Sequence, residues 1–256
     1  MQRKRSSVER RRSVLRTAVV WDALQQALHL RHQAVGAARP LDVLDLGGGT
    51  GGLAVRIAEL GHSVVVVDPS PDALASLERR AAELSVTSSV RGVLADAVTL
   101  LDVVDASSVD VVLCHGVLEV VDEPAQALKA VSTVLVEGGY LSVLAAQRSA
   151  AIFSRAVTGH LAEARAMLER SSTPSGRTDS LVRRFSSNEL HQQLVDAHFT
   201  VNEVRGVRVF IDHISSTLVD SEPDALEELR ALEAAVATDP DFLAIATQLH
   251  LLATRH

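Results

Sequence analysis

The segment "VLDLGGGTGGLA", from Val43 to Ala54, decides the fold of this chain. Apolar residues lead into a cluster of glycines, and a pattern typical of a helix follows. Glycine lets the backbone adopt positive φ angles and approach a ligand closely. The segment therefore predicts a strand, a tight ligand-binding turn and a helix.

Two ligand classes fit the spacing of these glycines. Gly47, Gly49 and Gly52 match the G-x-G-x-x-G pattern of a dinucleotide site. Asp45, followed by Gly47, Gly49 and Gly51, matches equally well the D-x-G-x-G-x-G pattern associated with S-adenosylmethionine. The glycines alone do not choose between the two.

The composition limits the class of protein. The chain has 256 residues, 47% of them hydrophobic, which is enough for a sizeable core. Its longest apolar runs are shorter than the ~20 residues of a membrane helix, and its basic start lacks an apolar export segment. The single cysteine, Cys114, excludes an internal disulfide and a cysteine-rich zinc site. We therefore expect a cytoplasmic protein of one domain, residues 1–256, with no membrane contact and no metal.

Positive charge is concentrated at the start of the chain. Residues 1–16 hold seven Lys or Arg and one acid, whereas the whole chain carries −7. A basic arm can lie on phosphate backbones, and it can equally be a solvated terminus. The second interpretation is the simpler one and makes residues 1–12 a flexible arm, but it leaves polyanion binding open.

Apolar runs alternate with helical patterns between residues 41 and 146. Most of the runs lack polar alternation, as do strands buried on both faces of a parallel sheet. This order predicts a doubly wound α/β fold. The predicted strands are 41–46, 63–68, 88–94, 109–114 and 140–146, and the predicted helices between them are 51–60, 70–84 (with Ser70 as N-cap and Pro71 in the first turn) and 123–136.

Further segments flank this core. Apolar residues at helical spacing predict a helix over 13–32. An insertion over 147–185 follows the fifth strand, at the edge of the sheet where ligands bind. The remaining residues, 186–256, are expected to complete the sheet with a helix that starts at Ser186, strands over 199–210 and 241–253, and a helix over 222–237.

Residues that follow the strands discriminate between the two ligands. Asp45 lies just before the glycine turn, where it can meet an ammonium group and would repel a pyrophosphate. Asp68 ends the second strand, where a carboxylate can accept both ribose hydroxyls. Asp96 and Ala97 follow the third strand, where a side chain and a backbone amide can hold an adenine edge. Together these residues indicate S-adenosylmethionine.

The core over residues 40–146 resembles the class I S-adenosylmethionine-dependent methyltransferases. The resemblance rests on the glycine segment, the acids after the strands and the "LVEGGYLSV" turn before the fifth strand. It implies a seven-stranded, mostly parallel sheet whose last strand runs antiparallel between the fifth and the sixth. It also implies S-adenosylmethionine as cofactor, held by Asp45, Gly47, Gly48, Gly49, Asp68, Asp96 and Ala97.

A narrower resemblance extends thinly over most of the chain. "LRTAVVWDAL", "CHGVLEVV" and "GVRVFIDHI" are similar to segments of the tRNA 5-carboxymethoxyuridine methyltransferases. Those enzymes esterify the carboxylate of a modified wobble uridine, so the resemblance implies tRNA as partner. The residues that hold the cofactor by this resemblance are Arg16, Gly47, Gly48, Asp68, Ala97 and His115.

Several of these residues have more than one interpretation. Arg16 contacts the cofactor or belongs to the basic arm. His115 contacts the cofactor, acts as base for a hydroxyl substrate or packs in the core. Arg208, expected on a half-buried strand, needs an anionic partner. With Asp212, expected on the same strand face, it either braces the strand end or holds a substrate carboxylate.

The chemistry favours a carboxylate as methyl acceptor. A carboxylate is ionised at pH 7 and needs no general base, so no catalytic residue is assigned. The leading prediction is methylation of the 5-carboxymethoxyuridine carboxylate in tRNA to its methyl ester. The alternatives are a small-molecule O-methyltransferase and a non-catalytic S-adenosylmethionine-binding protein.

Overall fold

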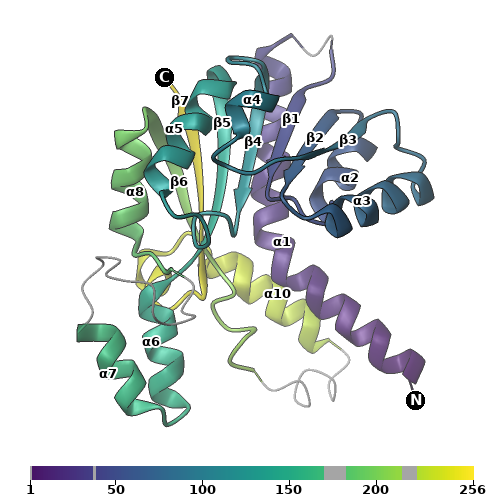
Figure 1. The fold of residues 1–256 in the computed structure, drawn as a ribbon. Coiled ribbons are helices and arrows are strands. Elements are labelled where there is room, and N and C mark those ends of the chain that lie inside the picture. Colours follow the sequence, from purple (N-terminus) through teal and green to yellow (C-terminus); the bar gives the residue numbers. More distant parts are fainter. Residues whose placement is uncertain (1, 37–38, 170–182, 215–223) are drawn as a thin grey trace. The chain divides into compact units, whose positions relative to one another are not determined.

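The computed structural model describes residues 2–36, 39–169, 183–214 and 224–256, with side chains from Thr17 onward. Its centre is a seven-stranded sheet of order β3-β2-β1-β4-β5-β7-β6 (Figure 1). The sheet confirms the predicted α/β fold. Its strands are β1 Asp42–Leu46, β2 Ser63–Asp68, β3 Val90–Leu94, β4 Val109–His115, β5 Leu135–Ala146, β6 Phe199–Val207 and β7 Gln248–Arg255.

Strand direction follows the prediction. The pairs β1–β2, β1–β4, β2–β3 and β4–β5 are parallel. Next to the end of β5, Gln147 N donates to Thr247 O at 3.0 Å, just before β7 begins. At the other end of β7, the Arg255 guanidinium donates to Leu135 O, where β5 begins. The last strand therefore runs antiparallel to β5 and lies between β5 and β6.

The helices follow the predicted alternation. The sequence predicted a helix over 13–32, whereas α1 begins at Gln2, so the segment 1–12 expected as a separate arm is helical from Gln2 onward. Ser70 Oγ accepts from Ala73 N at 3.2 Å and caps α3, with Pro71 at its start, as expected. The helices are α1 Gln2–Ala34, α2 Gly52–Glu59, α3 Pro71–Glu83, α4 Leu100–Val103, α5 Pro124–Val134, α6 Arg148–Val157, α7 Leu161–Glu169, α8 Ser187–Asp196, α10 Ala225–Val236 and α11 Pro240–Leu243.

Two predicted strands near the C-terminus were too long. The segment 199–210 is a strand only as far as Val207, because the next residue adopts a positive φ that ends the ladder. The segment 241–253 begins with the helix α11, since Asp239 caps Asp241 N and Pro240 presets the first turn. The strand β7 starts only after this turn.

The chain divides into two compact units. Unit 2 contains the strands β1 to β5 up to Ala145, with α2 and α3 packed against β2 and β3. Its central strand β4 is buried along most of its length, which explains the missing polar alternation. Unit 1 contains α10 and, within the predicted insertion, α6 packed on α7. Unit 1 is Met1–Leu24, Ala146–Ser187 and Glu203–His250, and unit 2 is Gln25–Ala145, Asn188–Asn202 and Leu251–His256.

Candidate functional site

The carboxyl ends of four parallel strands meet at one edge of unit 2 (Figure 1). Leu46 at the end of β1 is paired with Val67 of β2 and with Cys114 of β4, and Asp68 is paired with Leu94 of β3. Ligands of open α/β sheets bind at this edge. The structure therefore brings together the predicted residues Asp45, Gly47, Gly48, Gly49, Asp68, Asp96, Ala97 and His115.

A Cβ on Gly47, Gly48 or Gly51 of the glycine turn would clash with a neighbouring side chain. Gly47 has φ 69°, and its N–H donates to Val67 O at 2.7 Å. A Cβ on Gly47 would meet Val117 Cγ2 at 2.6 Å. A Cβ on Gly48 would meet the Asp45 carboxylate and lie 2.9 Å from Val66 Cγ1. Bare backbone at these positions follows from packing as well as from turn geometry.

The Asp68 carboxylate ties the glycine turn to the start of α3. Its Oδ2 accepts from Gly49 N and its Oδ1 accepts from Ser70 N, both at 2.9 Å. The residue is 8% exposed. Each carboxylate oxygen has two acceptor sites, so both retain capacity for the hydroxyls of a ligand.

Asp45 is a buried carboxyl that is only partly ionised at neutral pH. Burial, and after it the negative charge of Asp68, raises the pKa of Asp45 to about 7. Bringing a cation beside it would favour the ionised form, because opposite charges stabilise each other strongly in a buried site. The group is suited to an ammonium ligand.

Asp96 organises the turn after β3. Its Oδ1 accepts from Val98 N, Thr99 N and Thr99 Oγ1, each at 2.9 Å. These bonds, those from Thr99 first, hold the pKa of Asp96 below its usual value. All the hydrogen bonds described for the carboxylate go to Oδ1, so Oδ2 retains its capacity to accept from a ligand. Ala97 beside it is buried.

His115 ends β4 and is bonded to a neighbouring strand. Its Nε2 lies 2.8 Å from Ser142 Oγ of β5. Burial lowers the pKa of His115 to about 4, so the imidazole is neutral at pH 7. The sequence interpretation missed Ser142, although a hydroxyl in the apolar run "YLSVLAA" was a signal. Cys114 is fully buried with its pKa raised to about 12, chiefly by burial, and does not supply a thiolate.

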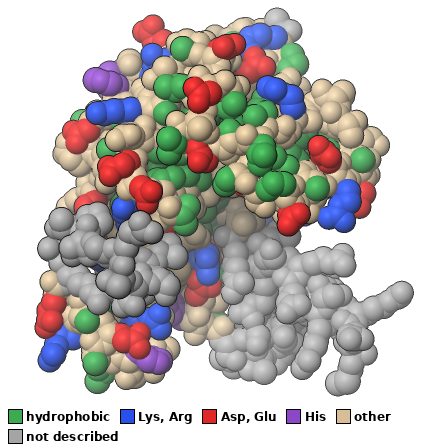
Figure 2. All heavy atoms as spheres, viewed as in Figure 1, with side chains coloured by type: hydrophobic (Ala, Val, Ile, Leu, Met, Phe, Trp, Pro, Cys, Tyr) green, Lys and Arg blue, Asp and Glu red, His purple; other side chains and the backbone are tan. Residues whose placement is uncertain are grey.

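Exposed apolar side chains accompany these polar groups. Leu94, Val98 and Leu101 follow β3 or end it, and Val120 follows β4. Val98 is 88% exposed. Hydrophobic side chains gather on the face shown in Figure 2, with acidic side chains among them. Mixed apolar and acidic surface of this kind is suited to a cationic ligand with an aromatic ring.

Arg208 and Asp212 form an ion pair in unit 1, but not on a strand. The predicted alternation along one strand was wrong, because β6 ends at Val207 and Arg208 has φ 63°. Arg208 Nη2 lies 2.6 Å from Asp212 Oδ2 across the turn. Arg208 Nε is buried and has no hydrogen-bond acceptor among the residues that the structure describes. Such a donor usually indicates a missing ligand or water.

Glu233 of α10 holds the same turn, and the sequence interpretation missed it. Its carboxylate accepts from Val209 N, Phe210 N and Ile211 N at 2.8 to 2.9 Å. Glu233 is 3% exposed and lies between the buried Leu229 and Val236 on the apolar stripe of the helix. An acid on such a stripe was the available signal, because a buried carboxylate needs donors.

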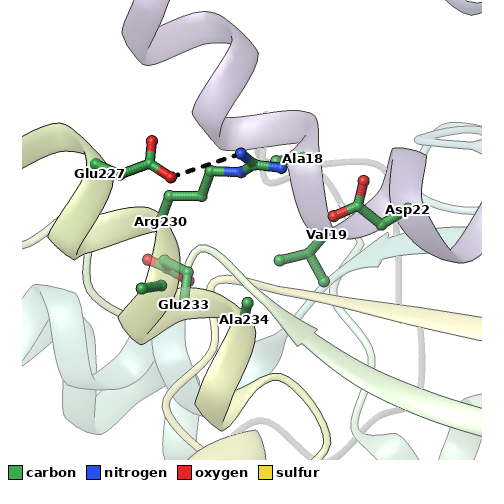
Figure 3. A pocket seen from close by; sticks show the side chains of 8 residues that line it. Ala18, Val19, Asp22, Glu227, Arg230, Glu233 and Ala234 are labelled. Carbon is green, nitrogen blue, oxygen red and sulfur yellow. Dashed lines mark ion pairs between the residues drawn. The ribbon is translucent and has the colours of Figure 1, made fainter.

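Glu233 also borders a cavity of about 180 Å³ between α10 and α1 (Figure 3). The cavity walls include Val19 and Asp22 of α1, and on α10 Arg230 pairs with Glu227 at 3.8 Å. None of the predicted site residues whose side chains are described lines this cavity.

Arg16 lies in α1, but its side chain is outside the described part of the chain, so its role stays a prediction. Within the described ranges, no cluster of His, Cys, Asp and Glu has the arrangement of a metal site. No helix among the described residues has the length and hydrophobicity needed to cross a membrane.

Comparisons with known proteins agree with this geometry. Residues 44–143 match the family model described as "Methyltransferase domain". The tRNA 5-carboxymethoxyuridine methyltransferase of Escherichia coli (strain K12) is 26% identical over 241 residues, which cover 94% of this chain and 88% of the relative. The ubiquinone biosynthesis O-methyltransferase of Xanthomonas campestris is 32% identical over 148 residues, 54% of this chain and 61% of the relative.

A solved structure supports the fold. Magnesium protoporphyrin IX methyltransferase from Synechocystis PCC 6803 with bound SAH has a TM-score of 0.58 and 15% identity. The match covers 96% of this chain and 83% of that chain. The names of these three relatives give three different molecules.

Proposed function

We propose that this chain, an S-adenosylmethionine-dependent methyltransferase of class I, methylates the carboxylate of 5-carboxymethoxyuridine in tRNA. The observation that carries the proposal is the extent of one similarity. The tRNA methyltransferase aligns along nearly the whole of both chains, including the part outside the cofactor core. The O-methyltransferase similarity covers only about half of this chain. The tRNA acceptor in turn implies a cytoplasmic enzyme.

The residues at the carboxyl edge fit the cofactor. S-adenosylmethionine supplies an electrophilic methyl group on a sulfonium. We infer that Asp68 accepts from its ribose hydroxyls, Asp45 faces its ammonium group, and Asp96 with Ala97 holds the adenine edge. The packing at Gly48, which leaves no space for a Cβ, and the raised pKa of Asp45 support this arrangement.

We infer that His115 contacts the cofactor and is not a base. Its pKa of about 4 leaves it neutral at pH 7, so it does not repel a sulfonium. The same low pKa makes it a poor proton acceptor. The bond to Ser142 holds the ring in one orientation. This role is consistent with an acceptor that needs no deprotonation.

We propose that Arg208 binds the acceptor carboxylate. Its Nε is a buried donor without an acceptor in the described structure, and Asp212 holds the guanidinium from one side. A non-glycine residue at positive φ costs of order 1–2 kcal/mol and persists only where its surroundings impose it. Glu233 imposes it here by holding the next three N–H groups. Orientation of the acceptor is the catalytic contribution expected of such a site.

The affinity for S-adenosylmethionine is expected to rise with pH up to about pH 7. Below that pH, Asp45 is mostly protonated and offers no charge to the ammonium group. Binding then requires loss of a proton, so affinity falls up to about tenfold per pH unit below the pKa. Titration calorimetry over roughly pH 5.5 to 7.5 measures this slope. Asp45→Asn should bind more weakly with a flat profile, and equal slopes in both proteins would contradict the assignment.

Arg208→Lys is expected to lower kcat on the modified tRNA about tenfold or more. Lysine keeps the charge but does not provide the planar fork that orients a carboxylate. Cofactor affinity and Tm should barely change. Arg208→Gly is the matched variant, because glycine tolerates φ 63°. It should keep or raise Tm while losing turnover. Full activity of Arg208→Lys, or unfolding of Arg208→Gly, would instead assign Arg208 to bracing the turn.

The proposed acceptor is tested by mass spectrometry of tRNA nucleosides. Purified enzyme, S-adenosylmethionine and tRNA that carries 5-carboxymethoxyuridine should yield the methyl ester. Methylation of a small phenol or carboxylic acid in place of the tRNA would favour the small-molecule O-methyltransferase, which the Xanthomonas relative supports. Cofactor binding without methylation of either acceptor would favour a non-catalytic binding protein.

A further inference from the structure

Unit 2 has a second hollow, separate from the cofactor edge. It has a volume of about 300 Å³ and lies where β4 and β5 begin, whereas Asp45 and Asp68 lie where β1 and β2 end. Because these strands are parallel, the hollow is at the opposite edge of the sheet. It is lined by Ala106, Ser107, Lys129, Ser132, Thr133, Ala197, His198 and Arg255.

The lining is basic in an acidic chain. Three of the eight side chains are Lys, Arg or His, three carry hydroxyls, and none is a carboxylate. The whole chain carries −7 and has only two lysines, one of which is Lys129. Asp196, which is close in sequence to His198, accepts from Gln192 Nε2 at 2.8 Å and does not line the hollow. The hollow therefore presents donors and positive charge.

The basic side chains come from separate elements that meet here. Arg255 at the end of β7 donates from Nη1 to Ser107 Oγ at 3.1 Å and to Leu135 O. A guanidinium has five N–H groups, so others remain for a ligand. Lys129 is exposed on α5, where its ammonium is a mobile point charge. This combination can surround an anion from two sides.

His198, just after the end of α8, adds an imidazole to the lining. It has φ 66°, which is unusual for a residue other than glycine. Its carbonyl accepts from His256 N at 3.4 Å, and the two rings meet edge to face with centroids 6.3 Å apart. The backbone here is thus held by the end of β7. This contact places the imidazole beside the hollow that Arg255 also lines.

We propose that this hollow binds a phosphate group. Phosphate has several strong acceptor oxygens and a negative charge that matches Lys129 and Arg255, and the imidazole of His198 can donate a hydrogen bond to it. The hydroxyl of Ser107, which accepts from Arg255, supplies a neutral donor, whereas the Thr133 hydroxyl already donates to Lys129 O at 2.9 Å. Phosphate binding itself does not depend on the proposed function. If the proposed function holds, the group is a backbone phosphodiester of tRNA, contacted far from the nucleotide that is methylated.

The test begins with inorganic phosphate alone. Wild-type protein is titrated with sodium phosphate, and with sodium chloride at matched ionic strength, by NMR of the Lys129 and His198 signals. Lys129→Glu and His198→Ala are each expected to weaken phosphate binding about tenfold. Arg79→Glu, an exposed charge reversal on α3, is the control and should have no effect. Arg255 is left intact because it bonds to Leu135 and Ser107.

The source of the phosphate is distinguished with tRNA. If it is the tRNA backbone, Lys129→Glu should weaken tRNA binding and reduce the slope of log K against log salt by about one. If tRNA binding is unchanged while phosphate binding is lost, the site serves a small phosphate ester. If the wild-type protein binds phosphate but not tRNA, the proposed tRNA function is refuted and the phosphate site is still supported. Binding no stronger than that of chloride, or unaffected by both variants, would overturn the site.

Discussion

Asp68→Ala is expected to weaken S-adenosylmethionine binding about 100-fold or more. The change removes the acceptor proposed for two ribose hydroxyls, and hydrogen bonds to a charged group contribute about 1.5–3 kcal/mol each. It also removes the acceptor of Gly49 N and Ser70 N, which holds the glycine turn against α3. Loss of the ligand contacts and loosening of the turn act in the same direction.

Titration calorimetry of the purified variant measures the change in affinity. Asp68→Asn keeps one acceptor oxygen and the shape of the side chain, so its loss should be smaller. Asp72→Ala, an exposed acid in the first turn of α3, is the matched control and should bind normally. Unchanged affinity in Asp68→Ala, or tight binding of NAD by the wild type, would defeat the cofactor assignment.

Glu233→Ala is expected to lower the free energy of unfolding by about 3 kcal/mol or more. Three N–H groups, those of Val209, Phe210 and Ile211, lose their common acceptor, and those of Val209 and Ile211 are buried. Each unsatisfied buried donor costs about 1–3 kcal/mol. The side chains of Val209 and Ile211 pack in apolar clusters with Val236 and Leu229, so the turn cannot easily rotate toward water.

The measurement is urea or thermal unfolding of the full chain. For a chain of this size, 3 kcal/mol corresponds to a fall in Tm of about 6–12 °C. Glu227→Ala on the same helix is the control, because its pair with Arg230 is exposed and such pairs contribute little. A change below about 1 kcal/mol in Glu233→Ala would show that other groups hold the turn.

The cofactor edge was predictable because its signals are local. Asp45, the glycines and Asp68 each follow or end an apolar run in the sequence, and parallel strands bring such ends to one edge. The requirement for glycine at position 48 could not be predicted in this way. Its need to be glycine comes from the Asp45 carboxylate and Val66 rather than from its own backbone angle, and those contacts depend on packing.

The turn that contains Arg208 was not predictable in the same way. Its residues, "GVRVFIDHI", alternate as a strand would, so periodicity favoured a strand through Arg208. Glu233, distant in sequence, accepts the N–H groups that a strand would have used in its ladder. The ion pair with Asp212 still forms, although across a turn. The expected pairing of Arg208 with Asp212 was therefore correct, although the expected strand was wrong.

The sequence alone specified the α/β class, the alternation of strands and helices, and the residues that follow the parallel strands. These follow from apolar runs, glycine turns and the periodicity of each segment, which act within a few residues of one another. Only the tertiary structure decided the neutral state of His115, the pKa of Asp45 and the acceptor role of Glu233. Protonation states and hydrogen-bond partners depend on burial and on neighbours far along the chain. Such neighbours are brought together only when the strands and helices pack.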